Sequence, residues 1–325
     1  MILTVTPNPS IDRTVALASA LTRGAVHRVR SVTNEPGGKG VNVARALQLA
    51  GLDAVALLPA AAHDPLIVAM TGAGIPFRCV PVDEPVRTNI AVTEPDGTTT
   101  KLNEPGATLD ATTLARLTDA VVGAAEDATW VVLSGSLPPG VPEGWYAEVV
   151  GLLTDRDCRI AVDTSEGPLS ALADEFGRAA PDLIKPNAEE LAGLVGESAE
   201  LLERAAAEGD PGPAAKAAQR LVDRGVGAVL ATLGAAGAVL VDGTGSWLAV
   251  PPPVTPRSTV GAGDASLAGY LRAHVAGAEP PRRLRMAVAY GSAAAALPGS
   301  AMPAPARLDL DAVRVTTIAP TPTSS

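Results

Sequence analysis

Short apolar runs rich in Val, Ile and Leu alternate along the chain with longer stretches rich in Ala and Leu. The runs predict buried strands, at residues 2–6, 54–58, 130–134, 159–163, 183–185 and 229–233. The stretches between them predict helices, at residues 40–50, 109–125, 142–154, 188–195, 213–224, 265–276 and 281–296. This alternation is typical of a three-layer α/β fold, in which helices flank a mostly parallel sheet. Several strands end at polar or glycine residues, and ligands bind such sheets at those ends.

Two segments break the alternation. Residues 14–33 show no helical period, and residues 88–102 predict a hairpin that turns at Pro95, Asp96 and Gly97. We expect them to form a small separate β-sheet that covers the active site as a lid. Its exposed strand edges would be protected by pairing across a two-fold axis, which predicts a homodimer formed through the lid. A single folded unit would span residues 1–315, followed by a frayed tail at 316–325.

The composition of the 325 residues excludes several classes of protein. A net charge of −10 argues against a nucleic-acid partner, and no apolar run reaches the roughly 18 residues of a membrane span. The first residues lack the basic segment of a signal peptide. Cys79 and Cys158 stand apart without metal-ligand spacing, so we expect two buried thiols of a cytoplasmic protein. The scattered His27, His63 and His274 argue against zinc chemistry.

The segment Ser-Thr-Val-Gly-Ala-Gly-Asp at 258–264 precedes a predicted helix. Its small residues allow a tight turn, and the free N–H groups at the helix start form an anion site suited to a phosphate. Asp264 would take a proton from an attacking hydroxyl, while the amides of Gly261, Ala262 and Gly263 hold the charge on the transferred phosphoryl group. Taken alone, the segment fits an ordinary helix N-cap better than a catalytic site.

Two other phosphate-binding motifs fail when they are tested directly. A P-loop around Lys39 would need Gly at Thr33 and Ser or Thr at Gly40. A dinucleotide motif that starts at Gly261 would need Gly at Ser266. The sequence therefore supports neither a P-loop NTPase nor a Rossmann dehydrogenase.

A second glycine-rich turn, Gly-Gly-Lys-Gly-Val-Asn-Val-Ala at 37–44, also precedes a predicted helix. Gly-Ser-Leu-Pro-Pro-Gly at 135–140, Lys-Pro-Asn-Ala-Glu-Glu at 185–190 and Thr-Leu-Gly-Ala-Ala-Gly at 232–237 follow in order. Together with the segment 259–264, this set resembles the ribokinase-like carbohydrate kinases of the PfkB family, over roughly residues 1–315. The opening residues 6–14 are similar to its sugar-phosphate branch, the 1-phosphofructokinases and tagatose-6-phosphate kinases.

The resemblance implies a role for each matching position. Asp264 matches the catalytic base, and Gly261, Ala262 and Gly263 match the anion hole for the γ-phosphate of ATP. Glu190, in an Asn-x-x-Glu motif, matches a residue that helps to hold Mg²⁺ through water. The positions that match the nucleotide side are Lys185, Asn187, Thr232, Gly234, Gly237 and Ser292. The positions expected on the sugar side are Asp12, Arg28, Gly37, Gly38, Lys39, Asn42, Arg87, Asn103 and Ser136.

A phosphorylated sugar requires cations nearby, and Lys39, Arg87 and Arg28 or Arg30 of the lid could supply them. The expected reaction transfers the γ-phosphoryl group of MgATP to a ketohexose phosphate. Fructose 1-phosphate is the best candidate, giving fructose 1,6-bisphosphate. Tagatose 6-phosphate and fructose 6-phosphate stay open as acceptors. A ribose or nucleoside kinase and a catalytically silent sugar-phosphate sensor also stay open.

Two positions depart from the family pattern. Ser258 stands where an acidic residue is often found, and residues 59–64, Pro-Ala-Ala-Ala-His-Asp, replace a glycine-rich segment. We expect His63 to be exposed on a loop there.

Overall fold

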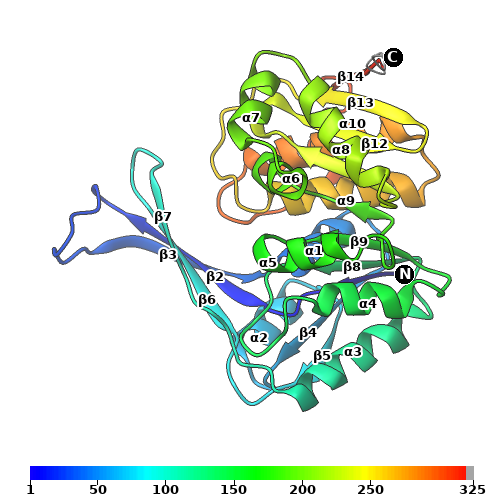
Figure 1. The fold of residues 1–325 in the computed structure, drawn as a ribbon. Helices are drawn as coiled ribbons and strands as arrows, with labels where there is room; N and C mark the ends of the chain where they lie inside the picture. Colours follow the sequence, from blue (N-terminus) through cyan, green and yellow to red (C-terminus); the bar gives the residue numbers. More distant parts are fainter. Residues whose placement is uncertain (320–325) are drawn as a thin grey trace.

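Ten strands form the central sheet of the protein, whose computed structural model describes residues 1–319 (Figure 1). Side by side, they are β14 (Arg314–Thr317), β13 (Gly245–Val250), β12 (Ala238–Asp242), β11 (Ala228–Thr232), β10 (Leu183–Ile184), β9 (Arg159–Asp163), β8 (Trp130–Ser134), β1 (Ile2–Val5), β4 (Ala54–Ala60) and β5 (Phe77–Pro81). The strands from β11 to β5 in this order run parallel, whereas β12, β13 and β14 pair antiparallel. The carboxyl ends of the parallel strands therefore meet at one edge of the sheet.

Helices cover both faces of this sheet (Figure 1). One face carries α3 (Ala111–Ala125), α4 (Trp145–Leu153), α5 (Glu166–Asp174), α6 (Ala188–Val195), α7 (Ala199–Ala207) and α8 (Gly212–Val222). The other carries α1 (Lys39–Leu49), α2 (Pro65–Gly72), α9 (Ala262–Val275) and α10 (Pro280–Ala295). Strand side chains alternate between the two layers: Leu3 and Val5 pack into the first, and Ile2 into the second. Two short 3₁₀ turns, η1 (Gly234–Ala236) and η2 (Pro305–Arg307), complete the described chain.

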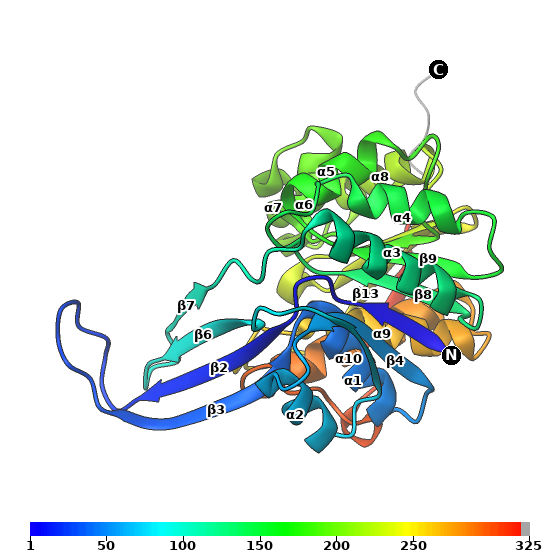
Figure 2. The ribbon, with the colours of Figure 1, turned by 90° about the horizontal axis from the view of Figure 1, so that it is seen from below.

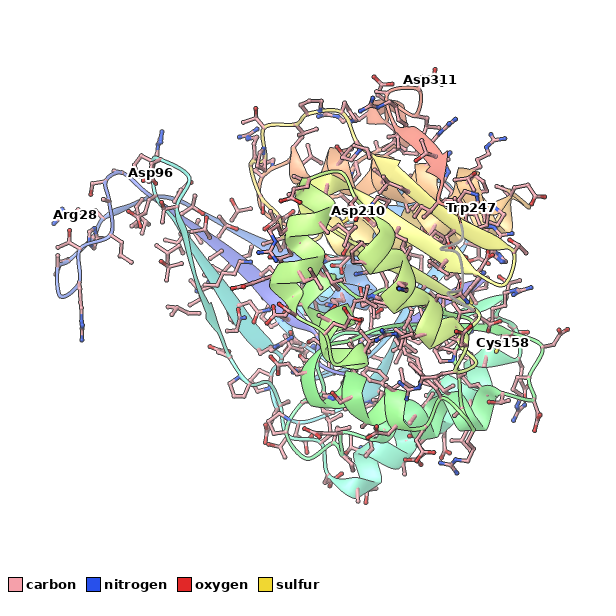
Figure 3. The ribbon with its side chains drawn as sticks, turned by 45° about the horizontal axis from the view of Figure 1, so that its top comes forward. Arg28, Asp96, Cys158, Asp210, Trp247 and Asp311 are labelled. Carbon is pink, nitrogen blue, oxygen red and sulfur yellow. The ribbon has the colours of Figure 1, made fainter. Side chains whose placement is uncertain are left out.

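A separate four-stranded sheet, the lid, projects from the body (Figure 2). Its strands lie in the order β3 (Val29–Gly37), β2 (Ser10–Leu17), β6 (Arg87–Thr93) and β7 (Thr99–Asn103), with β2 and β6 parallel. The hairpin between β6 and β7 turns where the sequence predicts, and Figure 3 shows Asp96 and Arg28 near the outer end of the lid. At the inner end, Ile11 packs into an apolar cluster with α1 and α2, which anchors the lid to the body.

The strands and helices predicted from the sequence are present, with small shifts at their ends. The structure adds α2, α5, α7, β5 and the antiparallel strands β12, β13 and β14, which the sequence pattern did not indicate. Proline and glycine weaken the sequence pattern of two of these elements, because both residues disfavour regular strands and helices. β5 ends at Pro81, and α5 contains Gly167 and Pro168.

The expected start of the tail at residue 316 is wrong. Thr316 and Thr317 belong to β14, where they pair with Leu248 and Trp247 of β13, so the ordered fold extends past residue 315. Residues 320–325 of the expected tail lie outside the described residues.

The two cysteines are less buried than expected. Cys79 is exposed because β5 is the edge strand of the sheet, and Cys158 is partly buried in the turn before β9. Both are free thiols in the part of the chain that the structure describes. His63 is exposed on the loop before α2, as predicted. Among residues 1–319, no helix combines the length and apolar character needed to cross a membrane.

Candidate active site

Asp163 forms the centre of a charged cluster at the carboxyl edge of the sheet. It is the last residue of β9, and its side chain is fully buried. Its Oδ1 lies 2.8 Å from Nζ of Lys39 at the start of α1, and its Oδ2 lies 3.2 Å from Nζ of Lys185. Burial disfavours the charged carboxylate, but the two ammonium groups prevail and hold the pKa of Asp163 below its usual value. Asp163 is therefore a fixed negative charge that holds two lysines in place.

Asp264 lies in the same cluster, in the first turn of α9. Its Oδ2 accepts a 2.8 Å hydrogen bond from Nδ2 of Asn42 on α1. Burial and the nearby charge of Asp163 raise the pKa of Asp264 to about 6, against the opposing effect of Lys39, Asn42 and Lys185. A carboxyl group with a pKa this close to neutral pH is suited to accept a proton from a substrate hydroxyl.

The backbone before Asp264 turns tightly into α9. Gly261 has φ 77°, a left-handed conformation that glycine adopts without strain, and α9 begins directly after it rather than at the predicted residue 265. The first amides of a helix have no partner within it, and the amide of Ala262 makes only a long 3.4 Å contact with Thr259. A Cβ atom placed on Gly263 would lie 3.0 Å from Nζ of Lys185. Helix amides and an ammonium group thus converge, an arrangement that binds phosphoryl oxygens.

The residues expected on the nucleotide side lie along the same edge. Asn187 and Glu190 form a capping box at the start of α6, in which each side chain accepts a 2.8 Å hydrogen bond from the other's backbone N–H. Thr232, the last residue of β11, pairs with Asn187 through a backbone bridge, and Gly234 opens the turn that follows. Ser292 is partly buried on α10.

These residues fit a Mg²⁺ ion held largely by phosphate and water. Among residues 1–319, no group of three or more His, Cys, Asp or Glu side chains is placed to hold a metal by itself. In phosphate sites, Mg²⁺ usually keeps several waters and takes only one or two carboxylates. One carboxylate oxygen of Glu190 accepts a hydrogen bond in the capping box. The negative charge of Glu190 also helps to raise the pKa of Lys39 in the charged cluster.

Several residues expected on the sugar side lie where the lid joins the body. Oδ1 of Asp12 on β2 accepts hydrogen bonds from Oγ of Ser10 at 2.8 Å and from Nδ2 of Asn89 at 3.2 Å. Burial raises the pKa of Asp12 despite these hydrogen bonds. Gly37 lies so close that a Cβ atom there would overlap the Asp12 carboxyl group, and Gly38 has φ 109°. Glycine at position 37 therefore leaves room for the Asp12 carboxyl group, and glycine at position 38 avoids an overlap with Thr6.

Arg87 lies beside Asp12 at the start of β6. Its Nη2 donates to the carbonyl oxygen of Asn8 at 3.1 Å and its Nη1 to that of Glu104 at 3.4 Å. Its buried Nε has no hydrogen-bond partner within residues 1–319, so this N–H group is left for a ligand. Nδ2 of Asn8 in turn donates to Oγ of Ser136 at 3.3 Å, which places Ser136 beside the loop between β1 and β2 that carries Asn8.

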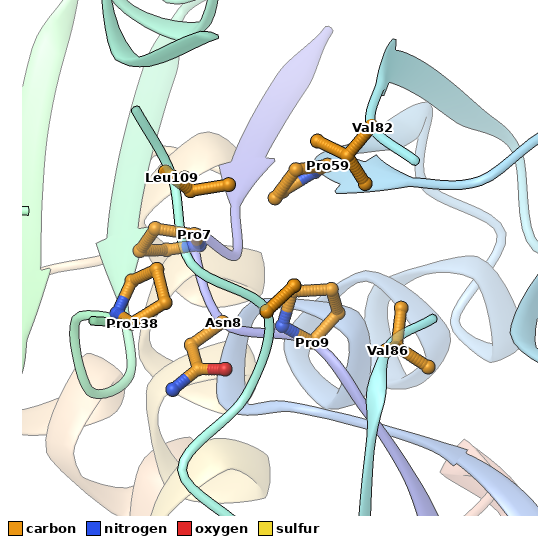
Figure 4. A pocket seen from close by; sticks show the side chains of 9 residues that line it. Pro7, Asn8, Pro9, Pro59, Val82, Val86, Leu109 and Pro138 are labelled. Atoms are coloured by element: carbon orange, nitrogen blue, oxygen red, sulfur yellow. The ribbon is translucent and has the colours of Figure 1, made fainter. Parts of the chain in front are cut away.

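Figure 4 shows a small pocket next to Asn8. Apart from Asn8, its lining is apolar, with Pro7, Pro9, Pro138 and Leu109 among the side chains. A sugar needs hydrogen-bonding groups on several sides, so this apolar pocket does not suit a sugar and is a packing gap next to the loop between β1 and β2.

Two of the expected sugar ligands are placed differently from the prediction. Arg28 lies near the outer end of the lid, away from the cluster within one chain, because β2 and β3 extend well beyond the body (Figure 3). Lys39 is paired with Asp163 and so lies beside Asp264 rather than free for a sugar phosphate.

Asn103 lies opposite Asn89, which lies opposite Asp12, so these three residues share one face of the lid.

Two residues of the site, Asp163 and Asn89, are not among those predicted from the sequence. Asp163 carried a usable signal, because it is an acidic residue directly after a buried strand. Asn89 carried a weaker one, because it follows Arg87 by two residues and so lies on the same face of a strand.

Comparison with known proteins gives one consistent result. The family model described as pfkB family carbohydrate kinase matches residues 5–307. A 1-phosphofructokinase of Rhodobacter capsulatus is 36% identical over 94% of both chains. An ATP-dependent 6-phosphofructokinase isozyme 2 of Escherichia coli is 34% identical over 90% of this chain and 92% of its own. The crystal structure of phosphofructokinase-2 from Escherichia coli in complex with substrates and products superimposes with a TM-score of 0.85 at 31% identity, covering 94% of this chain and 96% of that one. The chain therefore belongs to the pfkB family of carbohydrate kinases, and its fold is the ribokinase-like α/β fold of that family.

Proposed function

We propose that the protein transfers the γ-phosphoryl group of ATP to the 6-hydroxyl of fructose 1-phosphate, giving fructose 1,6-bisphosphate. The names of its relatives, 1-phosphofructokinase and 6-phosphofructokinase isozyme 2, support ATP-dependent phosphorylation of a fructose phosphate. The observation that carries the proposal is the position of Asp264. It is a buried carboxylate next to the helix amides and beside the pair of lysines on Asp163.

The chain's own residues account for the steps of the transfer. Asp264 accepts the proton of the sugar hydroxyl as its oxygen attacks the γ-phosphorus. The bond from that phosphorus to the β-phosphate oxygen of ATP breaks, and ADP leaves. The amides at the start of α9, with Lys185 and Lys39, stabilise the charge on the transferred group. Mg²⁺, held through water by Asn187 and Glu190, would neutralise charge on the phosphates.

The acceptor's own phosphate needs cations on the sugar side. Nε of Arg87 is one candidate, because it is buried and unpaired among the described residues. Lys101 on β7 is a second, since it shares the lid face of Asn103 and makes no ion pair within residues 1–319. Both would bind a phosphate as charge-assisted donors.

A coupled assay of ADP release tests the proposal directly. With MgATP, the acceptors are fructose 1-phosphate, fructose 6-phosphate, tagatose 6-phosphate, fructose and ribose. Fastest turnover on fructose 1-phosphate is expected. Preference for fructose 6-phosphate, with which phosphofructokinase-2 from Escherichia coli forms a complex in a crystal structure, would keep the mechanism and replace the acceptor. Turnover only on unphosphorylated sugars would contradict the role given to Arg87 and Lys101.

A homodimer through the lid is part of the same proposal. On the lid face opposite to Asp12, Val15, Val32 and Val92 lie next to one another, and Ile90 lies opposite Leu102. Val32 and Leu102 are 49% and 56% exposed in the single chain. Burial of this apolar face against a second copy of the lid would remove it from water.

The two free thiols support a location in the cytoplasm, which is kept reducing.

A further inference from the structure

Glu35 joins the lid to the body through contacts that the proposed chemistry does not use. It lies on β3 opposite Asp12, and its side chain is 20% exposed. Its Oε1 lies 3.2 Å from Nη1 of Arg45 on α1, and its Oε2 accepts a 3.3 Å hydrogen bond from Oγ of Ser300. One carboxylate therefore contacts both a helix of the body and the loop after α10.

That loop, residues 297–302, also touches the anion-binding turn. The methyl group of Met302 occupies the space next to Gly261, where a Cβ atom would lie 2.6 Å from it, and the backbone of Ser300 lies 3.9 Å from the same point. Ser300 and Met302 are 3% and 6% exposed, so both are packed in place. A shift of this loop would change the space around the amides that begin α9.

The loop contacts the lid at a second point. A Cβ atom on Gly299 would lie 3.2 Å from Oε2 of Glu35 and 3.6 Å from Oγ1 of Thr14 on β2. Glu35 and Thr14 share the lid face of Asp12, because the three positions alternate in register on paired strands. The sugar-binding face of the lid and the phosphate-binding turn are thus both in contact with one short loop.

We propose that Glu35 is a positioning residue that couples the sugar site to the nucleotide site through its hydrogen bond to Ser300. When a sugar phosphate holds the lid against the body, Glu35 holds the loop 297–302 against Gly261, and the anion site is kept in its binding shape. Binding of either substrate then favours binding of the other, because both stabilise the same contact. This inference rests on the proposed function, since it requires a sugar phosphate and a nucleotide as the two ligands.

Calorimetry on the full chain measures this coupling. The affinity for fructose 1-phosphate is determined with and without the magnesium complex of a non-hydrolysable ATP analogue, and the ratio of the two affinities is the coupling. In the wild-type protein we expect the analogue to tighten sugar binding at least about fivefold. In Ser300→Ala, which removes the hydrogen bond but leaves the Arg45 ion pair, we expect that ratio to fall at least about threefold toward one.

Two further variants keep the test specific. Glu35→Gln preserves the shape of the side chain and removes its charge, and we expect it to lower the ratio as well. Ser198→Ala is the matched control, because the Ser198 hydroxyl also takes part in one side-chain hydrogen bond, accepted from the N–H of Leu201 at the start of α7, away from the lid. It should keep the wild-type ratio.

The outcomes are distinct. A wild-type ratio of one, or a Ser300→Ala ratio equal to that of the wild type, overturns the coupling role of Glu35. If none of the fructose phosphates binds to the wild-type protein, the proposed function itself fails.

Discussion

At the residue scale, the charge of Asp163 governs the groups around it. It fixes two lysines, and it is also the charged neighbour that adds to burial in raising the pKa of Asp264 to about 6. Two carboxylates in one buried site favour the protonated form of one of them, and here that one is Asp264. In the proposed mechanism the same residue therefore positions the cations for phosphate and tunes the base. The pairing could not be predicted from the sequence, because Lys39, Asp163 and Lys185 are far apart along the chain.

The pH dependence of activity tests this tuning. Asp264 accepts a proton only when it is unprotonated, so kcat/KM for fructose 1-phosphate should rise with pH and level off above about 6. Asp163→Asn removes the negative charge that raises the pKa of Asp264, so the rise should move to lower pH, even though activity falls. The substrate phosphate also titrates near 6, but it does so equally with both proteins, and the comparison removes its effect. An unchanged midpoint in Asp163→Asn would show that Asp163 does not act on the base.

At the scale of elements, the site is assembled from the ends of strands and the starts of helices. β9, β10 and β11 end beside α1, α6 and α9, so residues from distant motifs meet at one edge. One of the motif glycines is also required by packing. Gly237 has φ 103°, and a Cβ atom there would overlap the carbonyl oxygen of Ala249 on β13. It is required by the tight turn between β11 and β12.

Gly237→Ala should therefore lower stability strongly. The added methyl group meets backbone at a left-handed position, and we expect a loss of about 1–3 kcal/mol in the free energy of unfolding. Urea unfolding measures it. Gly243→Ala, in the next turn, is the control, since no atom lies within 4 Å of its added Cβ and its φ is not left-handed. Equal stability of the two variants would contradict the packing role.

How far the sequence predicts these elements depends on how regular they are. The parallel strands and their helices, such as β8, β9 and α6, have the expected bounds because buried runs and a helix cap mark them. The antiparallel β12 to β14 extension was missed, since β12 and β13 follow one another without a helix between them and β14 is a strand of only four residues. The motifs located Asp264 and Asn42, but the distance from Arg28 to the site depends on how far the lid projects, which no local pattern records.

At the scale of the whole molecule, the lid is the part least supported by the rest of the chain. It projects from the body (Figure 2) with one polar face, carrying Asp12 and Asn89, and one face with exposed Val32 and Leu102. A sheet of this kind needs a partner for its apolar face, and a second copy offers a matching one.

Sedimentation measures this assembly. Each chain has a mass of 32.6 kDa, and the wild-type protein should sediment as two chains. Val32→Glu introduces a charge into the apolar lid face and should give single chains. Val68→Glu, at a valine of α2 that is 70% exposed, should leave the mass unchanged. Single chains in the wild-type protein would contradict dimerisation through the lid.

The most direct measurement of the proposed catalysis is the turnover of Asp264→Asn with MgATP and fructose 1-phosphate, alongside calorimetric binding of that sugar. Loss of the base should lower kcat by about 10²- to 10⁴-fold while the sugar still binds. Asp174→Asn, at an exposed residue that ends α5, is the control and should retain full activity. A wild-type protein that binds fructose 1-phosphate without turning it over would be a sensor rather than a kinase. Full turnover by Asp264→Asn would contradict the assignment of Asp264 as the base.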